Sequence, residues 1–172
     1  ESFLPENYKY FLSNTQPESD WVSSGFDDSG WSDGYSIIGW GDENDSTLVE
    51  PAPSIYLRYK FNVSSVADIK RMQFYTDFDD GFIAYLNGKE IVRVNMGMQG
   101  EPATNTTLAT RSHEALVFRN YCAPITGFFL DELQLDSTLV EGENILSVEV
   151  HNDSINGSDM SFYCNLVNLT GL

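Results

Sequence analysis

The sequence predicts an all-β protein built as an antiparallel β-sandwich. Short segments of alternating apolar and polar residues recur along the chain, and clusters of turn residues separate them. No segment has a sustained apolar period of 3.6 residues, as an amphipathic helix would. At 172 residues and 41% hydrophobic residues the chain can bury a substantial core, so we expect one β-sandwich domain over residues 1–172.

In the first third of the chain, clean strand alternation is expected only from residue 55 onward. Residues 1–20 are a lead-in segment in which Tyr8, Tyr10 and Leu12 alternate, which predicts a first short strand. Residues 50–53, EPAP, are too rich in proline for a central strand. Residues 55–63, IYLRYKFNV, alternate cleanly and predict a strand. One face carries Ile55, Leu57, Tyr59 and Phe61, and the other carries Tyr56, Arg58, Lys60 and Asn62.

The centre of the sandwich is predicted to be residues 73–94, QFYTDFDDGFIAYLNGKEIVRV. The pattern indicates two strands joined by a turn at Asp79-Asp80-Gly81, then a hairpin at Asn87-Gly88 and a third strand. Asn-Gly favours a type I′ turn because both of its central residues need positive φ angles. We therefore expect consecutive antiparallel hairpins here.

The remaining elements are shorter or follow a long loop. Residues 97–114 are polar and rich in Gly, Pro and Thr, and are expected to form a long surface loop. Residues 115–118 predict a short strand, and residues 129–135 a strand or turn. Residues 145–150 and 160–169 predict two further strands, the second of which closes the domain.

The charge of the chain narrows the classes of partner. With 26 Asp and Glu against 9 Lys and Arg, the formal net charge is −17. Nucleic acids and anionic membrane surfaces repel such a protein, so we expect neither as a partner. No apolar run approaches the roughly 20 residues of a membrane span. The composition fits a secreted or cell-surface protein, and a chain that starts at Glu1 without a signal-peptide pattern resembles a mature form or an excised module.

Several motifs occur in an order that resembles a known fold. They are residues 26–31 (FDDSGW), 39–42 (GWGD), 56–63 (YLRYKFNV), 79–88 (DDGFIAYLNG), 142–151 (GENILSVEVH) and 158–162 (SDMSF). The series resembles the galactose-binding-domain-like jelly roll, a β-sandwich. Similar strings occur in the sugar-binding domain of family 2 glycoside hydrolases and in modules of secreted bacterial multidomain proteins. The resemblance implies that Trp21 and Trp31 pack under an edge of the sandwich.

Motifs of catalysis are absent from the sequence. The chain has only two histidines, His113 and His151, and contains neither an HExxH nor a GxSxG string. We therefore expect a protein that is not an enzyme.

Acidic loops make calcium the expected cofactor. Calcium takes several oxygen ligands from carboxylates and carbonyls, and Asp79, Asp80, Asp42 and Asp159 lie in loops that a jelly roll can bring to one end. The alternative is that these side chains only bond local backbone N–H groups as turn and cap formers.

The favoured function is a non-catalytic carbohydrate-binding module of a secreted multidomain protein, with a glycan or polysaccharide and the neighbouring domains of the same polypeptide as partners. Sugar rings stack on aromatic faces beside hydrogen-bonding side chains. Trp40, Tyr35, Tyr121 and Phe128 are the candidate aromatic residues, although Trp40 could equally pack in the core. The alternative function is a structural or adhesive module that positions neighbouring domains or binds a protein.

The two cysteines, Cys122 and Cys164, lie in late segments that could be neighbouring strands. Outside the cell a disulfide between them is the expected state. The alternative is a pair of buried free thiols.

Overall fold

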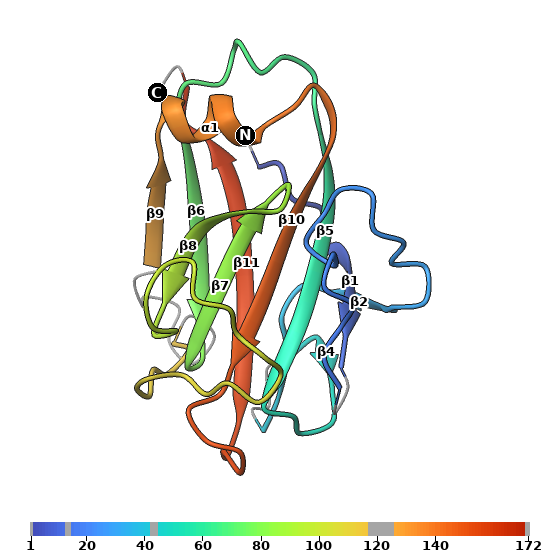
Figure 1. Cartoon of the computed structure of the whole chain (residues 1–172), viewed down its shortest axis with the longest axis vertical. Coiled ribbons are helices and arrows are strands. Elements are labelled where there is room, and N and C mark those ends of the chain that lie inside the picture. Colours follow the sequence, from blue (N-terminus) through green and yellow to red (C-terminus); the bar gives the residue numbers. More distant parts are fainter. Residues whose placement is uncertain (1, 13–14, 42–44, 117–125, 171–172) are drawn as a thin grey trace.

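The protein is a sandwich of two β-sheets (Figure 1). The computed structural model describes residues 2–12, 15–41, 45–116 and 126–170. The six-stranded sheet has the order β2-β1-β5-β10-β7-β8, and the five-stranded sheet has the order β4-β3-β11-β6-β9. Neighbouring strands are antiparallel except β3 and β4, which are parallel. The predicted all-β, antiparallel β-sandwich is confirmed.

Most elements follow one another with short connections, and the two long connections join β1 to β2 and β8 to β9. The bounds of the elements are β1 Asn7–Phe11, β2 Ser32–Tyr35, β3 Ile38–Trp40, β4 Thr47–Leu48, β5 Ser54–Val63, β6 Met72–Phe78, β7 Gly81–Leu86, β8 Lys89–Val94, β9 Thr126–Leu130, α1 Glu132–Thr138, β10 Gly142–His151 and β11 Met160–Asn168. Among the described residues no helix is both long and apolar enough to cross a membrane.

The main core lies between the two sheets and follows the predicted alternation of β5. Ile55, Leu57, Tyr59 and Phe61 are all buried in it. β10 pairs with β5 along its whole length and adds its own alternate apolar residues to the same core. The period-2 pattern of the sequence therefore set the inward face of the central strands, since alternate side chains of a strand point to opposite faces.

The predicted hairpin at Asn87-Gly88 is confirmed. Asn87 has a φ of 49° and Gly88 a φ of 84°, the two positive angles that a type I′ turn needs. The Asn87 side chain also reaches β10, where its Oδ1 accepts a hydrogen bond from the Ile145 N–H at 2.8 Å. The turn thus joins β7 to β8 and also fixes the hairpin against the neighbouring strand.

The expected hairpin at Asp79-Asp80 is wrong. β6 belongs to the five-stranded sheet and β7 to the six-stranded sheet, so the chain crosses from one sheet to the other at these two residues. Aromatic residues on both sides of the crossing hold it, with the Phe78 and Phe82 ring centroids 4.9 Å apart. Alternation could not reveal this, because a strand that stays in its sheet and one that changes sheet bury the same face. The crossing lies at the end of the sandwich opposite α1 and the two termini (Figure 1).

Helix α1 stands where a strand or turn was expected. It begins at a capping box in which the Asp131 side chain accepts a hydrogen bond from the Gln134 N–H, and the Gln134 side chain accepts one from the Asp131 N–H. The short strand expected at residues 115–118 is wrong for Ala115 and Leu116, which lie in no strand. Residues 117 and 118 lie outside the described residues.

The outer face of β5 is buried as well, beneath the connection between β1 and β2. Trp21 and Trp31 stack with ring centroids 6.1 Å apart and pack on Tyr56. They therefore cover an interior strand of the six-stranded sheet and not the edge that the resemblance implied. Beside them the buried Arg58 guanidinium donates from Nε to the Asp28 carboxylate at 2.9 Å. The same guanidinium also donates to the backbone carbonyls of Trp21 and Ser23. One arginine therefore anchors this connection at three of its residues.

Replacing Asp28 by Ala should lower the free energy of unfolding by about 3–5 kcal/mol, because it leaves the Arg58 charge buried without its counterion. Urea denaturation measures the loss. The matched control is Asp33→Ala, whose carboxylate pairs with Lys9 but is 86% exposed. That change should cost less than about 1 kcal/mol. Equal losses in the two variants would contradict the central role of the Arg58–Asp28 pair.

Candidate functional site

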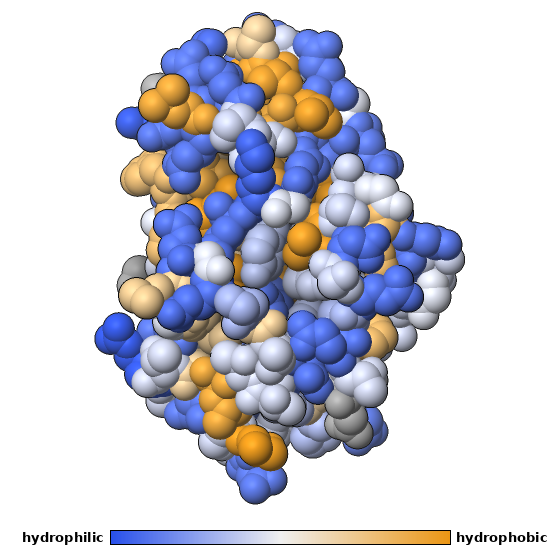
Figure 2. Space-filling view, viewed as in Figure 1, coloured by the Kyte–Doolittle hydropathy of each residue, from blue (hydrophilic) through white to orange (hydrophobic). Residues whose placement is uncertain are grey.

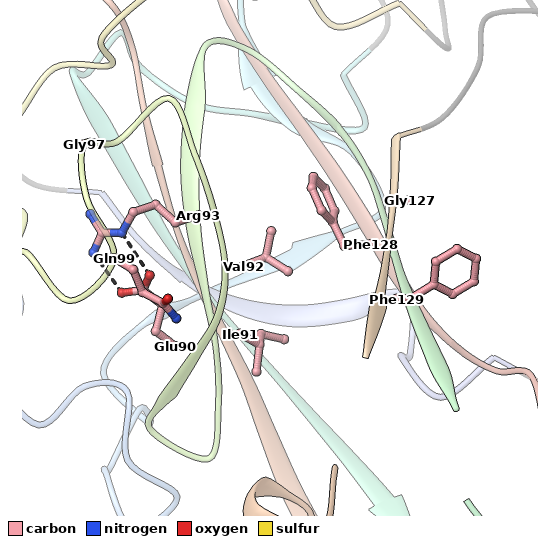
Figure 3. A pocket seen from close by; sticks show the side chains of 9 residues that line it. All are labelled: Glu90, Ile91, Val92, Arg93, Gly97, Gln99, Gly127, Phe128 and Phe129. Carbon is pink, nitrogen blue, oxygen red and sulfur yellow. Dashed lines mark hydrogen bonds and ion pairs between the residues drawn. The ribbon is translucent and has the colours of Figure 1, made fainter. Parts of the chain in front are cut away.

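A groove of about 490 Å³ opens between the edge strands of the two sheets, β8 and β9 (Figure 3). It exists because neither edge strand has a further described strand beside it to close the sandwich on that side. Its lining comes from β8 and the turn after it (Glu90, Ile91, Val92, Arg93, Gly97, Gln99) and from β9 (Gly127, Phe128, Phe129).

The floor of the groove is apolar and continuous with the main core. Ile91 and Val92 are nearly buried, and the Phe128 ring lies 6.2 Å from Phe82 and 6.5 Å from Phe74, centroid to centroid. Phe128 points toward β8, whereas Phe129 points the opposite way (Figure 3). Phe129 is 61% exposed and carries the Arg71 guanidinium 5.3 Å from its ring centroid. Of the two rings that line the groove, Phe128 is the one turned toward its interior.

The rim of the groove is polar and fixed. Arg93 pairs with Glu90 through two hydrogen bonds, Nε to Oε1 at 3.0 Å and Nη2 to Oε2 at 2.9 Å. Its remaining donors reach the carbonyls of Met96 and Glu101, both at 2.7 Å, which holds the turn after β8 against the strand. A bidentate arginine with further backbone bonds has little freedom to move. The arrangement joins an apolar floor to a rigid polar edge.

The structure brings one of the four predicted sugar-binding residues, Phe128, to this groove. Tyr35 lies at the end of β2, where its hydroxyl donates to Glu6 at 2.5 Å. Trp40 ends β3 opposite Met160, and its indole N–H is buried without an acceptor among the described residues. Tyr121 lies outside the described residues. A sugar-binding role for Tyr35, Trp40 and Tyr121 stays a prediction.

The polar rim of the groove was missed by the sequence reasoning. The only signal in the sequence was the spacing of Glu90 and Arg93. This pair can be recognised as the rim of a groove only when β8 is known to be an edge strand.

A second candidate site is an acidic cluster at the far end of the sandwich from α1. Ligand atoms of Asp79, Glu114 and Asp159 lie within 4.8 Å of one another. Asp79 stands at the crossing between the sheets, Asp159 just before β11, and Glu114 in the connection between β8 and β9. Three carboxylates at this spacing supply the hard oxygen ligands that a divalent cation such as calcium takes.

Asp79 is the member of the cluster that most needs a cationic partner. It is only 4% exposed, and its Oδ2 atom is buried without a hydrogen-bond donor among the described residues. Burial, followed by the negative charge of Asp80 and a side-chain contact with it, and then the charges of Asp159 and Glu114, raises the pKa of Asp79 to about 9. Near neutral pH this carboxyl therefore keeps its proton unless another cation replaces it.

Two of the four predicted metal ligands, Asp79 and Asp159, belong to the cluster. Asp80 does not, because its carboxylate oxygens accept backbone N–H bonds from His113 and Asp153, each at 2.7 Å. Its side chain accepts backbone N–H bonds, as the alternative expected, but from residues 33 and 73 positions away along the chain rather than from its own turn. Asp42 lies outside the described residues. Glu114 was missed because it sits in a long polar stretch without periodicity, where no pattern distinguishes one acid from another.

Both histidines hold the long connection in place. The His113 ring stacks on Phe78 with centroids 4.0 Å apart, and its Nδ1 lies 2.8 Å from the Phe78 carbonyl. His151 is fully buried between the Thr107 carbonyl, 2.8 Å from Nδ1, and the Glu149 carboxylate, 3.1 Å from Nε2. Each imidazole thus joins a strand end to the segment of residues 95–116.

Cys164 is buried in β11, and burial raises the pKa of its thiol to about 12. Its predicted partner, Cys122, lies outside the described residues. The disulfide between them therefore stays a prediction.

Comparison with solved structures identifies the fold. A β-glucuronidase of an uncultured Clostridium species aligns over 95% of this chain and 28% of its own, with 17% identity and a TM-score of 0.52. A calcium-binding mutant of Bacteroides uniformis β-glucuronidase 2 aligns over 99% of this chain and 19% of its own, with 14% identity and a TM-score of 0.57. A β-glucuronidase from glycoside hydrolase family 2 aligns over 95% and 17%, with 15% identity and a TM-score of 0.50.

This chain has a fold similar to that of a domain of family 2 glycosidases. It spans less than a third of the length of these three enzymes. No protein-family model and no curated protein matches the sequence. The likeness therefore supports the predicted resemblance in fold.

Without divalent cations, the protein should lose stability between about pH 6 and pH 9 because of Asp79. The folded state holds a proton on this carboxyl up to a pKa of about 9, whereas the ordinary value is 3.8. The stabilisation by this proton is fully present below the ordinary pKa of the carboxyl. It is lost as the pH rises through the pKa that Asp79 has in the folded state. In EDTA the melting temperature should fall by several degrees over this range, since 1 kcal/mol corresponds to roughly 2–4 °C at this chain length.

The matched comparison is Asp79→Asn, which keeps the shape of the side chain but cannot ionise. Its melting temperature should fall less between the two pH values, while the exposed Asp33→Asn should behave as the unmodified protein does. An equal fall in all three proteins would show that Asp79 is not the group responsible.

Proposed function

We propose that this protein is a non-catalytic carbohydrate-binding module of a secreted multidomain protein, and that the groove between β8 and β9 holds the sugar. The observation that carries the proposal is the groove itself, where a fixed Phe128 ring and apolar floor meet a rigid polar rim. Such a surface suits the C–H face of a pyranose ring, with hydroxyls reaching the rim.

The comparisons support a glycan as partner. The similar structures are β-glucuronidases, and this chain matches only a fraction of each. Their catalytic activity is not part of the proposal. The N- and C-terminal segments lie side by side, since Ser2 pairs with Val167, and both are at the end that carries α1 (Figure 1). Neighbouring domains would attach at that end and leave the acidic cluster at the far end.

The alternative is a structural module that positions neighbouring domains. Hydrophobic residues gather at the upper end of the molecule, near α1, and a smaller group lies at the lower end, with hydrophilic and intermediate residues over much of the face between them (Figure 2). Leu133 of α1 is 81% exposed. An apolar surface of this kind fits contact with another domain. The two functions use different surfaces. Sugar binding needs the groove between β8 and β9, whereas domain positioning needs the apolar surface near α1.

Calcium is the proposed stabilising cofactor, and the acidic cluster is its proposed site. The support is the convergence of Asp79, Glu114 and Asp159 together with the buried, unpaired oxygen of Asp79. One of the similar structures is described as a calcium-binding mutant of its own enzyme. Binding to the folded state alone would stabilise the module by mass action.

The sugar site predicts that Gln99→Ala and Phe128→Ala weaken glycan binding. A glycan array followed by calorimetric titration of the strongest ligand measures the affinity. Removing an aromatic stacking partner should lower affinity about 5-fold or more, since each lost contact of roughly 1 kcal/mol is a factor of about 5.

The matched control is Phe129→Ala, which removes the neighbouring ring that points away from the groove. It should leave affinity unchanged. Gln99 lies on the rim and away from the core, so its variant keeps the test valid if Phe128→Ala unfolds the protein. Loss of affinity in Phe129→Ala but in neither groove variant would place the sugar elsewhere, and binding of no glycan by the intact protein would favour the structural alternative.

Calcium should raise the melting temperature by way of the acidic cluster. At a hundredfold excess over its dissociation constant, a ligand of the folded state adds about 2.7 kcal/mol. The measurement compares EDTA, millimolar calcium chloride, and sodium chloride at matched ionic strength, because sodium also screens the net charge of −17. Glu114→Gln should abolish the difference between the two salts, and the exposed Asp33→Asn should retain it. Equal effects of calcium and sodium on the unmodified protein would leave only screening.

A further inference from the structure

Asp80 makes three hydrogen bonds that converge from different parts of the chain. Its carbonyl oxygen accepts from Asn95 Nδ2 at 2.8 Å, its Oδ1 from the His113 N–H and its Oδ2 from the Asp153 N–H, both at 2.7 Å. The side chain is buried. Bonds to a charged acceptor are the stronger kind, so these segments are held firmly to one residue.

Asp80 and two of its partners, His113 and Asn95, stand beside one of the two sites along the chain. Asp80 follows Asp79 of the acidic cluster, and His113 precedes Glu114 of the same cluster. Asn95 precedes the turn that supplies Gly97 and Gln99 to the groove. The backbone of Asn95 also accepts a hydrogen bond from Thr110 at 2.7 Å, which ties the two ends of segment 95–116 together.

The acidic cluster has a feature beyond its count of carboxylates. Asp79 is nine-tenths or more buried, yet one of its oxygens has no donor among the described residues, and the carboxylates of Glu114 and Asp159 lie within coordination range. A cation drawn between these three groups would pull Asp79 and Glu114 together. Asp80 and His113 are their chain neighbours and are bonded to each other, so they would follow.

We propose that a divalent cation bound by Asp79, Glu114 and Asp159 controls the groove between β8 and β9 through Asp80. The Asn95 amide is the link, because it joins Asp80 to the start of the groove wall. This inference rests on the proposed function for the identity of the groove ligand, but not for the coupling itself. Coupling between two sites is reciprocal, so a groove ligand also tightens the cation.

Hydrogen–deuterium exchange with calcium chloride as the probe tests the coupling without any sugar. In the unmodified protein, calcium should slow amide exchange at residues 112–114 near the cluster and also at residues 96–101 in the groove wall, by about 5-fold or more. In Asn95→Gly, protection at residues 112–114 should persist while protection at residues 96–101 disappears. Glycine suits this position because Asn95 has a φ of 56°.

The matched control is Ser36→Gly, which replaces another residue with positive φ, here 55°, in the connection between β2 and β3. It should show the full calcium response. Protection confined to residues 112–114 in the unmodified protein would overturn the coupling. The absence of any calcium response, with no heat of binding by calorimetry, would overturn the cation site as well.

A glycan found for the groove adds a second readout that separates this inference from the proposed function. Its affinity should rise about 5-fold or more with calcium in the unmodified protein and be independent of calcium in Asn95→Gly. A glycan bound equally well in EDTA and in calcium would keep the proposed function and end the coupling. Calcium protection of residues 96–101 without binding of any glycan would keep the coupling and end the proposed function.

Discussion

The crossing of the chain between the two sheets at Asp79 and Asp80 is the constraint on which one end of the structure depends. Two carboxylates are buried there side by side, and burial of charge is costly unless it is paired or neutralised. Asp80 meets the cost with hydrogen bonds from two backbone N–H groups. Asp79 meets it by keeping a proton, because burial and the neighbouring acids raise its pKa to about 9. The loops that approach the crossing are arranged around these two solutions.

The groove follows from a different constraint, the limited number of strands. A sandwich whose edge strands are β8 and β9 exposes the space between its sheets along that side. Ile91, Val92 and Phe128 partly fill that space, and the Glu90–Arg93 pair borders it. The long connection between β8 and β9 joins the two edge strands along the chain, and its described part contributes Glu114 to the acidic cluster. The groove and the acidic cluster, which differ in their chemistry, are therefore linked by the same segment of the chain.

The sequence predicted the parts of the fold that local patterns encode. Alternation in residues 55–63 placed β5 and its buried face, and Asn87-Gly88 placed a turn whose φ angles are both positive. The pattern could not tell a hairpin from a crossing at Asp79-Asp80, because both bury alternate residues and turn at the same place. It also missed α1, which is only seven residues long and owes its start to the side chains of Asp131 and Gln134.

Only those site residues could be predicted from the sequence whose residue type and local turn already indicate a ligand. Asp79 and Asp159 were identified as acids in turns, and Phe128 as an aromatic residue near a loop. Glu114 and the rim of the groove became visible only from the packing of distant segments. Asp80 shows the limit most clearly, since it has the same residue type and the same turn as Asp79. Only the structure shows that its oxygens already have donors.

The difference between these two adjacent carboxylates explains how an acidic end of the protein can be both stable and responsive. A carboxylate that already accepts two backbone N–H bonds gains little from a cation, and its geometry is set by the chain. A carboxyl that is buried among other acids binds any small cation that removes the repulsion, whether a proton or a metal ion. At the cation site that we propose, proton and metal would compete for Asp79, while Asp80 holds the segments of His113 and Asp153 in place. In the coupling that we propose, a cation bound at Asp79 would act on the groove through the fixed hydrogen bonds of Asp80.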